Sequence, residues 1–216
     1  MTDPTDSSSR QAVGHQYAFS LGMRDRALQK DQRPHVVWLT GLPSAGKSTI
    51  ANACDVRLTN LGFHCCILDG DRLRQGLTSD LGFSVEDRSE NVRRVGEVAY
   101  LCCSAGLIVF VALVSPFRED RDRVRALFQP GYFSEAFVTT PVDTCMARDV
   151  KGLYKRAAMG GVENMTGVSQ RYESPWAADI ELDGAGDIET VTDQLVEYLL
   201  ERVQDRRQNG HGRQSG

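Results

Sequence analysis

The chain has 216 residues, of which 41% are hydrophobic and 25% are charged, and its formal net charge at pH 7 is −4. This is enough for one sizeable folded domain, and the acidic balance argues against a protein that coats nucleic acid. No apolar run reaches the roughly 18 residues of a membrane-spanning helix, and the opening MTDPTDSSSR does not resemble a signal peptide. We therefore expect a cytoplasmic protein that binds no membrane.

Two polar ends are predicted to flank a single domain. Residues 1–30 form an N-terminal extension whose first half has the composition of a disordered segment, although residues 15–30 also fit a helix. Residues 205–216 are expected to be a disordered tail. Residues 31–204 are predicted to form the folded domain.

Within this domain, strand-like and helix-like segments alternate along the chain. Strands are predicted at residues 35–40, 64–69, 107–113, 135–140 and 178–183. Helices are predicted at about 47–61, from 71, and at 87–106, 118–128, 141–149 and 187–203. The alternation is typical of α/β proteins, so we expect a parallel twisted sheet with helices on both faces. Ligands in such folds bind beyond the carboxyl ends of the strands.

The cysteines form two adjacent pairs and two single residues, a spacing that matches no zinc-binding pattern. All six fall within predicted helices or strands. We therefore expect reduced thiols that pack as small hydrophobic groups. They are Cys54, Cys65, Cys66, Cys102, Cys103 and Cys145.

The stretch GLPSAGKST follows the first predicted strand and contains the phosphate-binding pattern G-x-x-x-x-G-K-S without a mismatch. Its glycines allow backbone N–H groups to turn toward a phosphate, and the following helix N-terminus adds partial positive charge. We expect Lys47 to reach the β- and γ-phosphates of ATP and Ser48 to hold Mg²⁺. The predicted ATP-binding residues here are Gly41, Leu42, Pro43, Ser44, Ala45, Gly46, Lys47, Ser48 and Thr49.

Two carboxylates at the end of the second predicted strand favour a kinase. Asp69 and Asp71 are separated by one glycine, and together they can orient Mg²⁺ and accept a proton from a hydroxyl group. Asp69 and Ser48 are the predicted metal ligands. The alternative for Asp71 is a helix N-cap, a role that is not expected for Asp69. A GTPase is disfavoured because the sequence has no N-K-x-D motif.

Basic and aromatic side chains follow in the stretch LGFSVEDRSENVRR. Arg74, which precedes it, and Arg88 are candidates for binding an anionic substrate, whereas Arg93 and Arg94 are expected to form salt bridges on a solvated face. Phe83 stands in a polar loop and can stack on a base. Each of these residues, taken alone, is also compatible with a structural role.

Together these motifs resemble the adenylylsulfate (APS) kinase family of phosphate-loop kinases. GLPSAGKST, LDGDRLRQGL, DLGFSVEDRSENVRRVGEVA, VSPFREDRDRVR, RDVKGLY and TGV occur in the family's order and spacing, from about residue 36 to 200. The resemblance implies transfer of the ATP γ-phosphate to the 3′-hydroxyl of adenylyl sulfate, which gives PAPS in sulfate assimilation. It also implies Mg²⁺, a mobile lid, a homodimer and, in some members, an ATP sulfurylase partner.

The resemblance also carries residue roles. It places Arg148 near the ATP adenine and makes Ser115 the counterpart of a serine described as a phosphorylated intermediate. We favour direct in-line transfer, with Lys47, Asp69 and Asp71 as catalytic groups, because no general base is visible beside Ser115 and phosphoryl transfer is mainly positioning and charge neutralisation. The implied contacts to the sulfonucleotide are Asp71, Arg74, Phe83, Arg88, Asn91, Val114, Ser115, Lys151, Asn164 and Met165.

The sequence departs from the family pattern in three places, namely Pro43, the lid, and Ala45, which replaces a common glycine and slightly reduces the freedom of the phosphate loop. Pro43 replaces a usual serine and removes one backbone donor from the phosphate loop. Asn164 and Met165 stand in the lid where the family usually has Gly and Phe, although a thioether can still cover a ring face. These lid changes leave open another acceptor, such as a cytidine nucleotide. A weakly active nucleotide-binding regulator is disfavoured because Lys47 and both carboxylates are present.

Overall fold

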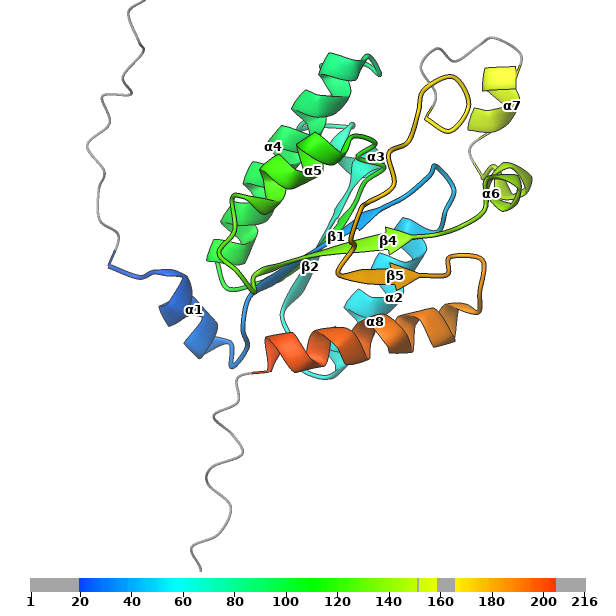
Figure 1. Ribbon diagram of the computed structural model, residues 1–216. Helices are drawn as coiled ribbons and strands as arrows, with labels where there is room; N and C mark the ends of the chain where they lie inside the picture. Colours follow the sequence, from blue (N-terminus) through cyan, green and yellow to red (C-terminus); the bar gives the residue numbers. More distant parts are fainter. Residues whose placement is uncertain (1–19, 151, 159–165, 205–216) are drawn as a thin grey trace, which may run out of the picture.

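The computed structural model describes residues 20–150, 152–158 and 166–204 (Figure 1). The predicted tail at 205–216 and most of the N-terminal extension lie outside these ranges, so the proposed division of the chain stays a prediction. Within the described ranges, none of the helices combines the length and apolarity that crossing a lipid bilayer requires.

Five parallel strands form one sheet, which confirms the predicted fold class. Their order is β2-β3-β1-β4-β5, so the strand that precedes the phosphate loop, β1, lies in the centre. All six residues of β1 are buried, as expected for a central strand covered on both faces. The strands are β1 (His35–Thr40), β2 (Cys65–Asp69), β3 (Ile108–Ala112), β4 (Phe133–Val138) and β5 (Ile180–Leu182).

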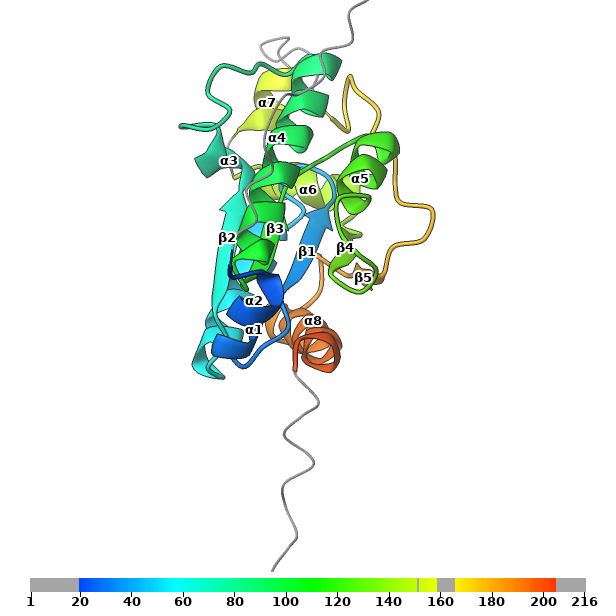
Figure 2. The same ribbon diagram turned by 90° about the vertical axis from the view of Figure 1, so that its left-hand side faces the viewer.

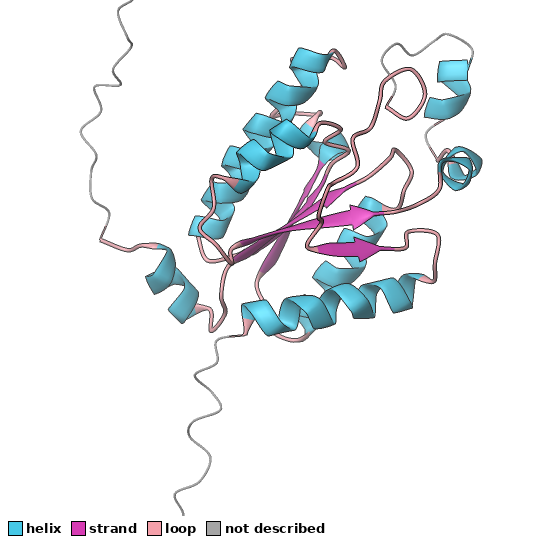
Figure 3. Ribbon diagram, in the orientation of Figure 1, coloured by secondary structure: helices cyan, strands magenta, loops and turns pink. Residues whose placement is uncertain are grey.

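Helices cover both faces of this sheet (Figures 1 and 3). Two of them, α2 and α8, pack on one face, and α4 and α5 pack on the other. In Figure 2 the strands point toward the end of the molecule that carries α3 and α7, and α1 lies at the opposite end. The helices are α1 (Met23–Gln29), α2 (Lys47–Asn60), α3 (Gly70–Leu73), α4 (Val85–Ser104), α5 (Arg118–Arg125), α6 (Val142–Arg148), α7 (Leu153–Ala158) and α8 (Ile188–Val203).

The alternation of side chains along β1 divides the core into two layers. Val37 and Leu39 face α2 and α8, whereas Val36 and Trp38 face α4 and α5. Successive side chains of a strand point to opposite faces, so an uninterrupted apolar strand supplies both layers. The carboxyl end of β1 is therefore held rigidly from both sides.

Several predicted boundaries differ from the structure by a few residues, and two helices differ most. The helix expected from residue 71 is only the four-residue α3, because the polar stretch after Leu73 continues as turns closed by backbone hydrogen bonds such as Gly76 N–H to the Leu73 carbonyl. The N-terminal helix begins only at Met23, and the beginning of the predicted range lies outside the described residues.

The cysteines agree with the expectation of reduced thiols. All six are free and lie in helices or strands, three of them fully buried and three partly buried. Burial raises the pKa of several of these thiols to about 12, which keeps them protonated and unreactive.

Candidate functional site

A cleft of about 1260 Å³ opens at the carboxyl ends of the strands. Its walls come from the phosphate loop, the β2–α3 junction, the start of α4, the turn after β3 and the loop between β5 and α8. Most of the predicted site residues meet here. Those that line the cleft are Pro43, Ser44, Ala45, Gly46, Lys47, Ser48, Thr49, Asp69, Asp71, Arg74, Phe83, Arg88, Asn91, Val114, Ser115 and Arg148.

The remaining predicted site residues do not line the described cleft. Gly41 is buried at the base of the phosphate loop, and Leu42 packs against the core. Lys151, Asn164 and Met165 lie outside the described residues, so their predicted substrate contacts stay predictions.

Glycine is required at both ends of the phosphate loop. Gly41 has φ +151°, and a Cβ there would lie 2.7 Å from the carbonyl oxygen of Val138. Gly46, with φ +104°, is the N-cap of α2. The Lys47 ammonium group donates to the carbonyl oxygens of Gly41 (3.0 Å) and Leu42 (2.7 Å), and therefore lies over the loop. An ammonium group above a helix N-terminus makes a site for an anionic phosphate.

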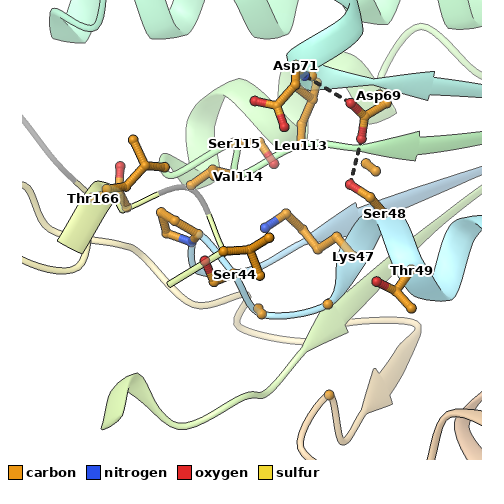
Figure 4. Close-up of a pocket in the computed structure, with 18 of the residues that line it drawn as sticks. Ser44, Lys47, Ser48, Thr49, Asp69, Asp71, Leu113, Val114, Ser115 and Thr166 are labelled. Carbon is orange, nitrogen blue, oxygen red and sulfur yellow. Dashed lines mark hydrogen bonds between the residues drawn. The ribbon is translucent and has the colours of Figure 1, made fainter. Parts of the chain in front are cut away.

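Asp69 joins the phosphate loop to α3, and its N-cap role corrects the prediction. Its Oδ1 accepts the backbone N–H groups of Asp71 (3.0 Å) and Arg72 (3.3 Å), so the cap is Asp69 and not Asp71. Asp69 takes this position because it has extended backbone dihedrals directly before the first helical residue. Its Oδ2 accepts the Ser48 hydroxyl at 2.5 Å (Figure 4).

Asp71 does not cap α3, and its side chain is oriented differently from that of Asp69. Figure 4 shows its carboxylate turned away from Asp69, on the side of the cleft that carries Leu113 and Ser115. Both predicted carboxylates therefore border the cleft, one beside the phosphate loop and one beside the turn after β3.

Ser115 is buried in a hydrogen-bonded network. Its side chain is 3% exposed, its Oγ donates to Thr40 Oγ1 (3.1 Å), and the Trp38 indole N–H donates to it (3.0 Å). Thr40 Oγ1 in turn donates to the Val114 carbonyl (2.8 Å) and lies 2.9 Å from the Tyr172 hydroxyl. Among the described residues, no carboxylate or imidazole group is a hydrogen-bond partner of Ser115 Oγ, so no base is placed to remove its proton.

Arg74 and Arg88 form a basic wall of the cleft that the phosphate loop also lines. The guanidinium groups of Arg74 and Arg88 lie 4.3 Å and 5.3 Å from the centre of the half-exposed Phe83 ring. Burial and the neighbouring charge of Arg74 lower the pKa of Arg88 to about 10, a sign that the two cations repel each other. Nearby, Asn91 is 5% exposed, and its Oδ1 accepts no hydrogen bond from the described residues. Close cations and an unsatisfied amide favour a polar, anionic ligand.

Arg93 and Arg94 form salt bridges on the outer face of α4, as predicted. Arg93 binds Glu90 at 2.7 Å, and Arg94 binds Asp80 at 2.7 Å and Glu90 at 2.9 Å. Hydrogen bonds from both arginines lower the pKa of Glu90 to about 2. The side chains of Arg93 and Arg94 form these salt bridges outside the cleft, whereas Arg74 and Arg88 line it.

Sequence reasoning missed Gly184 and Tyr154, which are hydrogen-bonded to two of the predicted ATP-binding residues. Arg148 Nη1 donates to the Gly184 carbonyl at 2.7 Å, and a Cβ on Gly184 would overlap Thr140 Oγ1 and the carbonyl oxygen of Ala45. The Tyr154 hydroxyl donates to the Pro43 carbonyl at 3.2 Å. For Gly184 the signal was its position after a strand at the carboxyl edge of the sheet, and Tyr154 is the last residue of the motif RDVKGLY.

Comparisons with known proteins agree with this geometry. A sequence profile of the family described as "Adenylylsulphate kinase" matches residues 33–183. The adenylyl-sulfate kinase of Shewanella pealeana is 51% identical over 188 residues, which are 87% of this chain and 91% of that protein.

Solved structures point the same way. The Mycobacterium tuberculosis APS kinase CysC in complex with AMPPNP and APS superposes with a TM-score of 0.74 at 37% identity, covering 77% of this chain and 98% of that one. A hexameric APS kinase from Thiobacillus denitrificans gives a TM-score of 0.58 at 29% identity, covering 80% of this chain and 30% of that one. Because both the profile and the close relative span most of its length, the chain belongs to the adenylylsulfate kinase family.

Proposed function

We propose that the protein transfers the γ-phosphate of ATP to the 3′-hydroxyl of adenylyl sulfate by direct in-line displacement within this cleft. The observation that carries the proposal is that two anion-binding walls line the same cleft: the phosphate loop with Lys47, and the basic wall with Arg74 and Arg88. A kinase needs one such wall for each of its two charged substrates. The relatives favour APS as acceptor and give no support to a cytidine nucleotide or to a weakly active nucleotide-binding regulator.

The donor binds on the phosphate loop. The backbone N–H groups at the start of α2 and the Lys47 ammonium group bind the β- and γ-phosphates and offset the charge that spreads over the transferred group. Arg148 and Gly184 line the same cleft as the phosphate loop and are hydrogen-bonded to each other, and we propose that they contact the ATP adenine.

Ser48 and Asp69 fit a Mg²⁺ ion. A hydroxyl and a carboxylate are hard oxygen donors, and in this structure they already face each other at 2.5 Å. Mg²⁺ in such a site neutralises phosphate charge and polarises the transferred group. Asp69→Asn retains a side-chain oxygen for the α3 cap but removes the negative charge. We expect this variant to need more Mg²⁺ for half-maximal activity while its thermal unfolding stays unchanged.

The acceptor binds against Phe83 and the basic wall. The guanidinium groups there bind the charged groups of APS, the exposed ring stacks on its base, and Asn91 Oδ1 accepts a hydrogen bond from the ligand. Asp71 borders the acceptor side and is the candidate for accepting the proton of the attacking hydroxyl. The proposal does not require a phosphorylated Ser115. The Ser115 hydroxyl is buried, donates a hydrogen bond to Thr40 and accepts one from Trp38.

The test compares two arginines of the same helix. Arg88→Ala should raise the KM for APS by about 10- to 100-fold, the range expected for losing a charge-assisted hydrogen bond, and should leave the KM for ATP unchanged. Arg93→Ala, which loses only outward salt bridges to Glu90 and Glu97, is the matched control and should behave like the wild type. ADP release is measured with APS, with CMP and without acceptor, and the product is identified by chromatography. Failure of the wild-type protein to phosphorylate APS would refute the proposal.

Assembly and location follow from the resemblance alone. We expect a homodimer in the cytoplasm, and an ATP sulfurylase partner is a further prediction. The hexameric relative from Thiobacillus denitrificans shows that other assemblies occur among APS kinases. Light scattering of the purified protein distinguishes a dimer from a hexamer.

A further inference from the structure

Arg121 is a fully buried cation that lies outside the cleft. It is on α5, its side chain is 2% exposed, and it is not among the residues that line the cleft wall. It therefore has no direct contact to offer a substrate. A buried charge of this kind is unusual unless it is paired and fully hydrogen-bonded.

Its guanidinium group binds three separate segments of the chain. Nε donates to Glu135 Oε1 on β4 (2.5 Å), Nη1 donates to the carbonyl of Ser115 (2.7 Å), and Nη2 donates to the carbonyl of Glu173 (2.8 Å). Glu135 belongs to the rigid sheet. Ser115 belongs to the turn after β3 that lines the acceptor side of the cleft. Glu173 belongs to residues 172–174, here called the return segment, which lead from Thr166 and Gly167 back to β5.

The turn at Ser115 needs such support because its backbone is strained. Ser115 has φ +40°, a left-handed conformation that residues other than glycine adopt only when their surroundings enforce it. Its carbonyl accepts the Arg121 hydrogen bond, and its hydroxyl is bonded to Thr40 and Trp38. The strained turn sets the direction in which Val114 and Ser115 face the cleft.

The same turn is bonded directly to the return segment. The Glu173 N–H donates to the Pro116 carbonyl (2.9 Å), and the Arg118 N–H donates to Glu173 Oε2 (3.0 Å). Tyr172 stacks on Phe137 with ring centres 6.0 Å apart, and its hydroxyl lies 2.9 Å from Thr40 Oγ1. Turn, return segment and the end of β1 therefore form one unit, with Arg121 behind it.

The return segment follows residues that contact the phosphate loop. Gly167 packs so closely that a Cβ there would lie 2.9 Å from Leu42 Cδ2. Thr166 is fully buried and lines the cleft. A displacement of the return segment would therefore also displace residues that line the cleft beside the phosphate loop.

We propose that Arg121 is a positioning residue for the acceptor half of the site: it holds the Val114–Ser115 turn in its strained conformation and binds that turn to the return segment. This inference rests on the proposed function. The three acceptors are bound by three different nitrogens of one planar guanidinium group, whereas a lysine ammonium group carries its three donors on a single nitrogen and cannot reach all three positions. The ion pair with Glu135 alone does not explain why an arginine is buried at this position, because a buried ion pair often adds little net stability to a fold.

The kinetic test uses Arg121→Lys and a matched control. Arg121→Lys keeps a positive charge beside Glu135 but loses at least one of the two carbonyl contacts. It should lower kcat/KM for APS by about 10- to 100-fold, the effect of a small misplacement of binding groups, and leave the KM for ATP within about twofold. The control is Arg125→Lys one turn away, which alters contacts to Glu135 and Asp179 but touches neither the turn nor the return segment. Equal kinetic effects in the two variants, or an equal rise in both KM values, would overturn the proposal.

A second readout does not depend on the reaction. Hydrogen exchange without nucleotides should show lost amide protection in peptides covering 114–116 and 172–174 of Arg121→Lys, with protection of 47–60 retained. Changes confined to α5 and β4 would contradict the inference even if the protein proved inactive toward APS.

Tyr172→Phe is a second variant, to be used if Arg121→Lys does not fold, because it leaves the ion pair between Arg121 and Glu135 intact. The variant should raise the KM for APS without changing the KM for ATP. An unchanged KM for APS in folded Tyr172→Phe would count against the proposed link between the return segment and the acceptor half of the site.

Discussion

A buried histidine should make the stability of this protein depend on pH below neutrality. His35 on β1 is 1% exposed; its Nδ1 lies 3.2 Å from the Gly131 carbonyl and its Nε2 lies 2.8 Å from Ser134 Oγ. A carbonyl oxygen only accepts, so Nδ1 carries the proton and Nε2 accepts the Ser134 hydroxyl proton. The Tyr198 hydroxyl, 2.8 Å from Ser134 Oγ, then donates to it. This network is complete with a neutral imidazole.

The magnitude follows from the pKa of His35. Burial lowers it from 6.5 to about 4, with the charges of Arg202 and Arg33 adding to the effect and the Gly131 hydrogen bond opposing it. Because the folded pKa lies below the unfolded one, the unfolded chain takes up a proton first as the pH falls. The stabilisation is complete above pH 6.5 and is lost as the pH falls toward 4, about 3 kcal/mol in all, of which about 2 kcal/mol is lost by pH 5.

Urea unfolding at pH 7.5 and pH 5 measures this loss, and His35→Gln is the comparison. Glutamine can donate to Gly131 and accept from Ser134 but does not titrate in this range. The wild-type free energy of unfolding should fall by about 2 kcal/mol more than that of the variant between the two pH values. Equal losses in the two proteins, or a His35 ring that titrates near pH 6.5 by NMR in the folded state, would refute the reasoning.

Three further predictions concern the cleft. Lys47→Ala should abolish phosphoryl transfer with little change in thermal unfolding, since it removes phosphate neutralisation and no core packing; near-normal ADP release from the folded variant would contradict the kinase site. Ser115→Ala should keep measurable activity, and complete loss together with an isolable phosphoserine in the wild type would show that transfer is covalent. Gly184→Ala should raise the KM for ATP and destabilise the fold by about 1–3 kcal/mol through its overlap with Thr140. Gly76→Ala, where a Cβ meets no atom within 4 Å, is its control in both kinetics and urea unfolding, and identical behaviour of the two would be evidence against the overlap.

The phosphate loop could be located from the sequence because its geometry is determined locally. Gly41, Gly46 and Lys47 act through backbone conformation and through contacts within six residues of one another, and a local pattern reports such constraints well. The strands were recognised for the same reason, since an apolar run such as that of β3 reflects burial on both faces. The predicted acceptor-site residues came from the APS kinase motifs, because no single local pattern distinguishes substrate-binding arginines from structural ones.

The parts that sequence reasoning missed depend on contacts between distant residues. Asp69 was not expected to cap a helix, because the cap depends on where α3 begins, and helix boundaries are poorly determined by composition. Ser115 is surrounded by Trp38, Thr40 and Tyr172, and Tyr172 is far from the other two in the sequence. Their meeting depends on the strand order, which a single sequence does not reveal.

Pro43, which departs from the family pattern, shows how such contacts change the expected effect of a substitution. Judged from the sequence, proline only removes a backbone donor from the phosphate loop. In the structure the carbonyl of Pro43 accepts the hydroxyl of Tyr154, a residue of α7 that is 3% exposed and whose own N–H is bonded to the carboxylate of Asp149. The rigid proline ring limits the directions in which this carbonyl can point. The substitution therefore exchanges one N–H group for a more rigid attachment between the phosphate loop and the helix beside it, and a loop fixed in this way loses less entropy when it binds a nucleotide.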